Sequence, residues 1–130
     1  MVLVDTNIWI HAFKYPEATV IPVLAQLVLE KHACMTPIIR AELLSGAKNE
    51  ANYRFLEEKL VSVPLLEEKP GLWDQAAHAR FRLARSGIQE SLIDLSIACA
   101  AHQNHAPLWT LDKQFIAIQK VVPFKRFQFN

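Results

Sequence analysis

The chain opens with MVLVDTNIWIHAF (residues 1–13), where an apolar run stops at Asp5 and resumes after Thr6 and Asn7. The short run VLV is rich in β-branched residues, which predicts a buried strand. Residues 7–13 then predict a helix, with Thr6 or Asn7 as its N-cap. Asp5 thus follows a buried strand directly. By itself the stretch leaves two interpretations open for this acid, a helix cap and a group that does chemistry.

Strand-like and helix-like segments alternate along the rest of the chain. The expected strands are residues 2–4, 33–35, 61–66, 108–110 and 121–124. The expected helices are residues 7–13, 21–32, 49–59, 72–85 and 91–103, one that starts at Thr36-Pro37 and stops at Gly46, and a helical turn over 113–118. Pro64 lies inside one expected strand, which therefore belongs at a sheet edge. The alternation predicts an α/β fold whose parallel sheet carries helices on both faces.

Length and composition suit one domain spanning residues 1–130, with 52% hydrophobic residues to build a core. Cys34 and Cys99 lie among apolar neighbours, so we expect buried free thiols, although a disulfide is an open alternative. No leader or membrane span is evident, which predicts a cytoplasmic protein without membrane contact. The net charge of +1 does not indicate nucleic acid, so an anionic partner would need local basic patches.

Four acids stand in positions that ordinary surface acids rarely occupy. Asp5 and Asp112 each follow an expected strand, at the sheet edge where α/β folds bind ligands. Glu42 interrupts the apolar face of its helix, and Asp94 lies in a nearly apolar helix where a lone carboxylate is costly. Their combination indicates a functional cluster. Glu90 lies one helical turn before Asp94. We expect it to be solvated or to hydrogen-bond to the metal-binding acids without touching the metal, and a role as a further ligand beside Asp94 is the open alternative.

Each acid also has a purely structural interpretation. Asp5 and Asp112 would cap the helices that follow them, and Ser91 with Asp94 matches a capping box. Glu42 would pair with a basic neighbour on the surface, either Arg40 or Lys48. These interpretations remain open from the sequence alone.

Converging carboxylates repel one another and raise each other's pKa values, and a divalent cation removes that penalty. Ligands that are all oxygen atoms indicate Mg²⁺ or Mn²⁺ and disfavour zinc or copper. The most common chemistry of such sites is phosphoryl transfer or phosphodiester hydrolysis by a metal-activated water. The four acids therefore predict an enzyme that acts on phosphate esters.

Three stretches resemble one known family: VDTNIWI (4–10), RAELLSG (40–46) and IDLSIACAAHQNHAPLWTLDKQF (93–115). The chain is similar, almost end to end, to the PIN-domain ribonucleases, and more closely to the VapC-type toxins of bacterial toxin–antitoxin pairs. The third stretch is the most specific. In it an acid, a helix of small residues, a strand, a Thr and an Asp-x-x-Phe follow in the family's order.

The resemblance implies a single PIN-like domain over residues 1–130, a three-layer sandwich with a central parallel sheet of about five short strands. It implies a Mg²⁺- or Mn²⁺-dependent endoribonuclease that is the toxin of a toxin–antitoxin system. The implied catalytic and metal-binding residues are Asp5, Glu42, Asp94 and Asp112, and the supporting residues are Thr6, Asn7 and Thr110. Arg40 and Lys113 are the candidate RNA-binding residues, because each lies close in the sequence to one of these acids. Asp112 is the acid that varies in the family.

The resemblance also implies a homodimer and a groove for a cognate antitoxin protein. We expect this groove around Trp9, Phe13 and the apolar helix at residues 20–29. Together these residues carry more apolar surface than one small core can bury. Two other functions are alternatives: a catalytically silent PIN-like module that binds RNA or acts as a scaffold, and a flavodoxin-like phosphoacceptor. The sequence leaves open the RNA target, the number of metal ions and the identity of the antitoxin.

Overall fold

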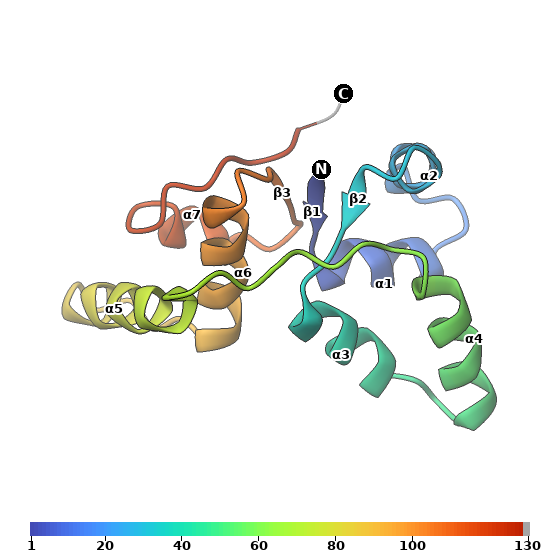
Figure 1. Cartoon of the computed structure of the whole chain (residues 1–130), viewed down its shortest axis with the longest axis horizontal. Helices are drawn as coiled ribbons and strands as arrows, with labels where there is room; N and C mark the ends of the chain where they lie inside the picture. The colour runs from blue at the N-terminus through green and yellow to red at the C-terminus, as the bar shows by residue number, and fades with distance from the viewer. Residues whose placement is uncertain (129–130) are drawn as a thin grey trace.

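The computed structural model describes residues 1–128, and three short parallel strands form its centre (Figure 1). Strand β1 (Val2–Val4) lies between β2 (Ala33–Cys34) and β3 (Leu108–Trp109). Leu3 is aligned with Cys34 on one side and Leu108 on the other. Because the strands are parallel, all of them end at the same edge of the sheet.

The predicted sheet of about five strands is wrong in number, because two expected strands do not form. The segment 61–66 reaches the sheet only through a bridge between Met35 and Leu65. The expected strand 121–124 is absent, and its place beside β3 is taken by a bridge between Leu108 and Arg126. Pro64 and Pro123 interrupt these segments, and proline has no N–H to give to a ladder.

Helices make up most of the described chain and agree with the predicted helices except at their ends. They are α1 (Thr6–Lys14), α2 (Val20–Leu29), α3 (Pro37–Ser45), α4 (Glu50–Leu60), α5 (Leu72–Arg85), α6 (Leu92–Gln103) and α7 (Gln114–Ile118). Figure 1 shows α1 to α4 on one side of the strands and α5 to α7 on the other, as the predicted layers require. The layers thus leave the carboxyl edge of the sheet bordered by α1, α3, α6 and α7.

Local sequence sets where most helices begin. The Thr36 side chain accepts a hydrogen bond from the N–H of Ile39, and Pro37 is the first residue of α3. Ser91 caps α6 in the same way, accepting from the N–H of Asp94 at 3.1 Å. Of the caps that the sequence offered for α1, Asp5 is confirmed, because its carboxylate accepts from the N–H of Thr6, while Thr6 and Asn7 are wrong.

The core joins the central strand to helix α6. Residues 95–101 of α6 are all buried, as are the three residues of β1. Cys34 and Cys99 are buried free thiols, as predicted. Among residues 1–128, no helix has the length and hydrophobicity needed to cross a bilayer. The buried strand and helix hold the residues at their ends in fixed positions.

The cap of α6 gives a test of this architecture. We expect Ser91→Ala to lower the free energy of unfolding by about 1 kcal/mol, because the N–H of Asp94 loses its acceptor. Thr19→Ala is the matched control, since Thr19 precedes α2 without making a side-chain cap bond. Urea denaturation of both variants measures the difference. Equal losses in the two variants would contradict the assigned cap.

Candidate functional site

Asp5 is the most constrained acid of the chain. It follows β1 and is 5% exposed. Its Oδ1 accepts the N–H of Thr6 at 2.8 Å, and its Oδ2 accepts the Thr110 hydroxyl at 2.8 Å and the Asn7 amide at 3.2 Å. Three donors, two from the start of α1 and one from the residue after β3, therefore hold this carboxylate in one orientation.

Asn7 and Thr110 also tie the ends of β1 and β3 to each other. The Asn7 amide donates to the Thr110 hydroxyl at 3.2 Å, and its carbonyl oxygen accepts the N–H of Leu111 at 3.1 Å. The Thr110 hydroxyl in turn accepts the N–H of Asp112 at 3.0 Å. These bonds fix the loop that carries Asp112 against the start of α1.

Glu42 comes to the same edge from α3. Its Oε1 accepts the hydroxyl of Thr6 at 2.9 Å, one residue after Asp5. The recorded partner of this acid is thus Thr6, and not the basic neighbour that the structural interpretation of the sequence offered. The structure therefore brings Glu42 beside Asp5.

Asp94 and Asp112 complete the set from the other side of the sheet. Asp94 lies in the first turn of α6, where Ser91 accepts a hydrogen bond from its N–H. Asp112 follows β3, and its Oδ1 accepts the N–H of Gln114 at 2.9 Å. Asp112 therefore also makes the Asx-type cap that the sequence offered as its structural alternative. Asp112 is therefore both a helix cap and a member of the acidic site.

The acids interact electrostatically. Burial raises the pKa of Asp5 to about 6, and the hydrogen bonds from Thr110 and Thr6 oppose this shift. The negative charges of Asp94 and Glu42 raise the Asp5 pKa further. Both lie in distant parts of the chain, so their influence indicates that the fold brings these carboxylates to the same edge of the sheet.

The pKa of Asp94 is raised in the same manner. Burial is the main cause, the hydroxyl of Ser91 opposes it, and the charges of Asp112 and Glu42 add to it. Glu90 joins this group: burial raises its pKa first, and Asp94 and Asp112 raise it further. Glu90 is only 9% exposed, so solvation, one of the two expectations for this residue, is wrong, and a role in support of the other acids stays a prediction.

Sequence reasoning missed Gln114, the first residue of α7. Its side-chain amide lies between the carboxylates of Asp94 and Glu90. The signal that was available is its position two residues after Asp112, in the turn that follows β3. The predicted supporting residues were Thr6, Asn7 and Thr110, and Gln114 was not among them.

The donor set suits a hard divalent cation. Its charged groups are all carboxylates, and the raised pKa values of Asp5, Glu90 and Asp94 indicate that these three acids would gain from a nearby positive charge. Within residues 1–128, no three His, Cys, Asp or Glu side chains already stand as a ready metal-binding group. The acids are thus held at one edge of the sheet, on separate elements.

The two predicted RNA-binding residues have different positions. Lys113 lies between Asp112 and Gln114 at the start of α7 and is exposed. Arg40 lines a groove beside α3 together with Tyr53 and Leu65. It precedes Glu42 by two helical positions, about 200° around the helix axis, so the two side chains leave α3 on different sides. Lys113 is therefore the basic residue nearer the acids along the chain.

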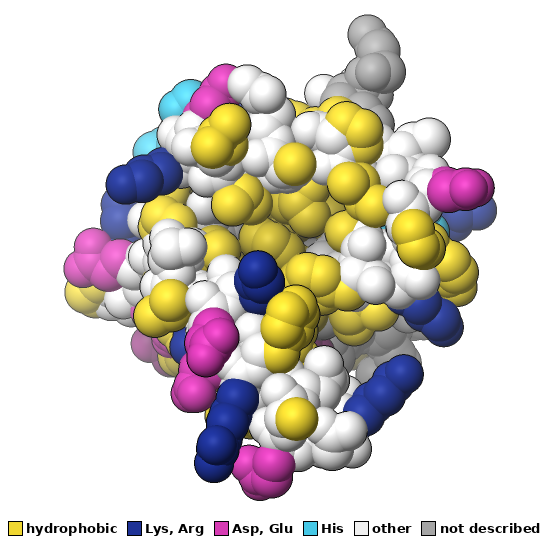
Figure 2. Space-filling view, turned by 90° about the vertical axis from the view of Figure 1, so that its right-hand side faces the viewer, with side chains coloured by type: hydrophobic (Ala, Val, Ile, Leu, Met, Phe, Trp, Pro, Cys, Tyr) yellow, Lys and Arg dark blue, Asp and Glu magenta, His cyan; other side chains and the backbone are white. Residues whose placement is uncertain are grey.

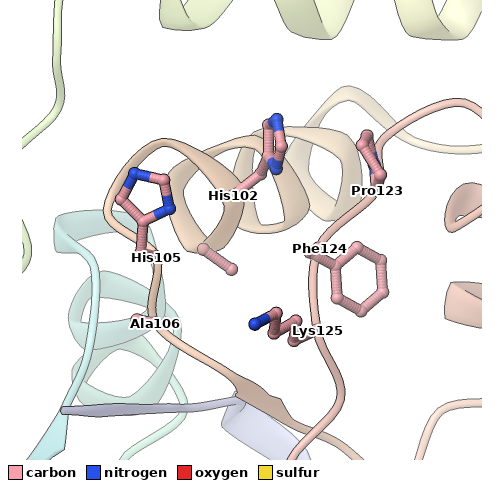
Figure 3. Close-up of a pocket in the computed structure, with 7 residues that line it drawn as sticks. His102, His105, Ala106, Pro123, Phe124 and Lys125 are labelled. Carbon is pink, nitrogen blue, oxygen red and sulfur yellow. The ribbon is translucent and has the colours of Figure 1, made fainter.

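Another hollow lies at the far end of α6 from Asp94. Figure 3 shows the rings of His102 and His105 bordering it, with Lys125 and Phe124 on the opposite wall. None of the acids described above lines it. The carboxylates and this cavity are therefore separate features of the molecule.

The raised pKa of Asp5 predicts a pH-dependent stability. Since the folded-state pKa of about 6 exceeds the ordinary value of an aspartate, the unfolding free energy of the metal-free protein falls as pH rises from about 4 to above 6. Asp5→Asn removes this loss, so between pH 4 and 7 the variant gains about 3 kcal/mol at most relative to the wild type. Denaturation in chelator at both pH values measures it. Parallel pH profiles would contradict the assignment.

Comparison with known proteins identifies the family of this chain. The family model described as the PIN domain matches residues 2–121. The chain is similar to the VapC ribonuclease Mb1587 of Mycobacterium bovis, at 26% identity over 134 aligned positions that cover all of both chains. Ribonuclease VapC11 of Mycobacterium tuberculosis shows the same identity and coverage.

Solved structures agree as well. VapBC-1 from nontypeable Haemophilus influenzae matches with a TM-score of 0.76 and 26% identity, over 98% of this chain and 97% of the other. VapBC2 from Rickettsia felis, bound to a promoter DNA fragment, matches with a TM-score of 0.74 and 24% identity, over 98% of each chain, which supports the fold. The similarity to VapC proteins that the sequence predicted is confirmed. Because the family model covers almost its whole length, this chain belongs to the PIN domain family.

Proposed function

We propose that this protein is a Mg²⁺- or Mn²⁺-dependent endoribonuclease that acts as the toxin of a toxin–antitoxin pair. The observation that carries the proposal is the electrostatic coupling of Asp5 to Asp94 and Glu42 at the carboxyl edge of the sheet. Relatives that align over the whole of both chains and are named as VapC ribonucleases support the choice of RNA as substrate.

The acids have separate roles in this proposal. Asp5 and Asp94 would hold one ion, while Glu42 and Asp112 would hold a second ion or its waters. When bound, such an ion acidifies a water molecule and stabilises negative charge at the phosphorus and on the leaving oxygen. The protein's own part is to keep the carboxylates in place: Thr110 and Asn7 orient Asp5, and Thr6 orients Glu42.

The substrate is held by basic residues near the acids. Lys113 is exposed next to Asp112 and would contact an RNA phosphate. Because a net charge of +1 gives little long-range attraction, such local contacts would have to hold the RNA. The alternative function, a PIN-like module that binds RNA without cleaving it, would need the same surface but no ion. Cleavage assays therefore separate the two.

The first prediction from this proposal concerns Asp5. We expect Asp5→Asn to lower RNA cleavage by more than about 100-fold. Removing a residue that only hydrogen-bonds to a metal ligand usually costs about 10- to 100-fold, and losing a ligand itself should cost more. The fold should persist, because the side chain keeps its shape. The readout is sequencing of RNA ends, together with the cleavage rate of purified protein in Mg²⁺.

Asp74→Asn is the matched control, since Asp74 is the remaining aspartate of the chain and lies exposed in the first turn of α5. This control should cleave RNA like the wild type. A folded Asp5→Asn protein with full metal-dependent activity would refute the site assignment. RNA binding without cleavage by the wild type would favour the silent module.

The proposed antitoxin would bind on the face shown in Figure 2, where apolar side chains surround a hollow. Helices α1, α2 and α4 line this groove with residues that include Phe13, Val28, Leu29 and Lys59. Leu29 is 80% exposed and Phe13 is 48% exposed, an unusual amount of apolar surface for neighbouring helices. An amphipathic segment of the antitoxin would cover it.

One residue of this face differs from the prediction. Trp9 is 4% exposed, so it is a core residue, although its ring also lines the groove. Its Nε1 donates to the carbonyl oxygen of Val4 at 3.1 Å, which explains its burial next to the central strand. The exposed part of the groove is therefore formed by Phe13 and α2. The homodimer stays a prediction, and light scattering of the isolated toxin tests it.

The groove gives a second prediction. We expect Leu29→Asp to weaken binding of the protein encoded in the neighbouring reading frame by about 10-fold or more, because a charge would enter an apolar contact. Cleavage of RNA should stay unchanged. Phe81→Asp is the control, since Phe81 is 55% exposed on α5, away from the groove. Equal binding by both variants in a titration would rule out this groove as the antitoxin site.

A further inference from the structure

Gln114 occupies an unusual place for an exposed residue. With its side-chain nitrogen turned toward the acids, it donates to Oδ2 of Asp94 at 3.3 Å and to Oε2 of Glu90 at 3.2 Å. The opposite orientation would press the amide oxygen against two carboxylates. An amide is oriented by its hydrogen-bond partners, so the nitrogen faces the acids.

The backbone of Gln114 reaches a third acid. Its N–H donates to Oδ1 of Asp112 at 2.9 Å. One residue thus contacts Asp94, Glu90 and Asp112, which come from α6, the segment before α6 and the loop after β3. An amide NH₂ offers two donors, which matches the two carboxylates that it faces.

These carboxylates need such a donor. Asp94 and Glu90 repel each other, since the charge of Asp94 raises the pKa of Glu90. Glu90 is 9% exposed, and a carboxylate in that position is costly unless it accepts hydrogen bonds. A neutral donor lying between two acids stabilises both charges and adds no positive charge that would compete with a cation.

We infer that Gln114 is a positioning residue of the proposed reaction. Its amide holds Asp94 and Glu90 together, so Glu90 is a fifth acid of the cluster. This inference rests on the proposed function, because it assigns Gln114 and Glu90 to the same metal-dependent site. The backbone N–H of Gln114 would hold Asp112 in place beside these two acids.

Substitutions at Gln114 test the inference. We expect Gln114→Ala to lower RNA cleavage by about 10- to 100-fold and to raise the half-saturating Mg²⁺ concentration by a similar factor. Gln114→Glu should be at least as damaging, because it brings a further carboxylate against two others. The same shift in Mg²⁺ requirement should appear without RNA, in the Mg²⁺-induced rise of the melting temperature.

Ile116→Ala is the control, since Ile116 is 54% exposed on the same short helix. It should leave both cleavage and the Mg²⁺ requirement unchanged. A Gln114 side chain that made no bonds to Asp94 and Glu90 would tolerate Glu, which has the same shape and favours helix. Wild-type activity and an unchanged Mg²⁺ midpoint in Gln114→Glu would therefore overturn the inference.

A double variant tests whether Gln114 and Glu90 act together. If they do, Gln114→Ala combined with Glu90→Gln loses no more activity than the worse single variant. Losses that multiply would overturn the joint role. A wild type that does not cleave RNA would refute the proposed function instead, and the melting titration with Mg²⁺ would still test the positioning role.

Discussion

The structure depends on one constraint, a carboxylate placed at the end of the most buried strand. Asp5 is nearly inaccessible to solvent, so its carboxylate oxygens need hydrogen-bond donors from the protein. Thr6, Asn7 and Thr110 do this with three hydrogen bonds. Because Thr110 follows β3 and Thr6 begins α1, satisfying this one side chain also fixes the strand, the helix and the loop relative to one another.

The parallel sheet explains how acids from distant parts of the sequence meet. Strands that all end at one edge bring Asp5 and Asp112 together, and the helices bordering that edge add Glu42 and Asp94. The caps are part of the same arrangement. The hydrogen bonds that cap α1 and α7 also orient Asp5 and Asp112. The same contact thus makes each acid a helix cap and holds it in place within the acidic site.

The helices were largely predictable because their signals are local. Thr36-Pro37, Ser91 and Gly46 mark helix ends through bonds to neighbours in the chain. The outer strands were not predictable, because segments 61–66 and 121–124 have strand-like composition but contain proline. Whether such a segment pairs depends on N–H groups reaching a neighbour that is distant in sequence. Single bridges at Leu65 and Arg126 are what remain.

The sequence by itself determined that four acids stand at strand ends or on apolar helix faces, since period and composition fix the side of an element on which a residue lies. Only the tertiary structure decided which acids interact. It buried Glu90 beside Asp94 and placed the Gln114 amide between them. Distances between elements follow from how the core packs, and no local pattern encodes them.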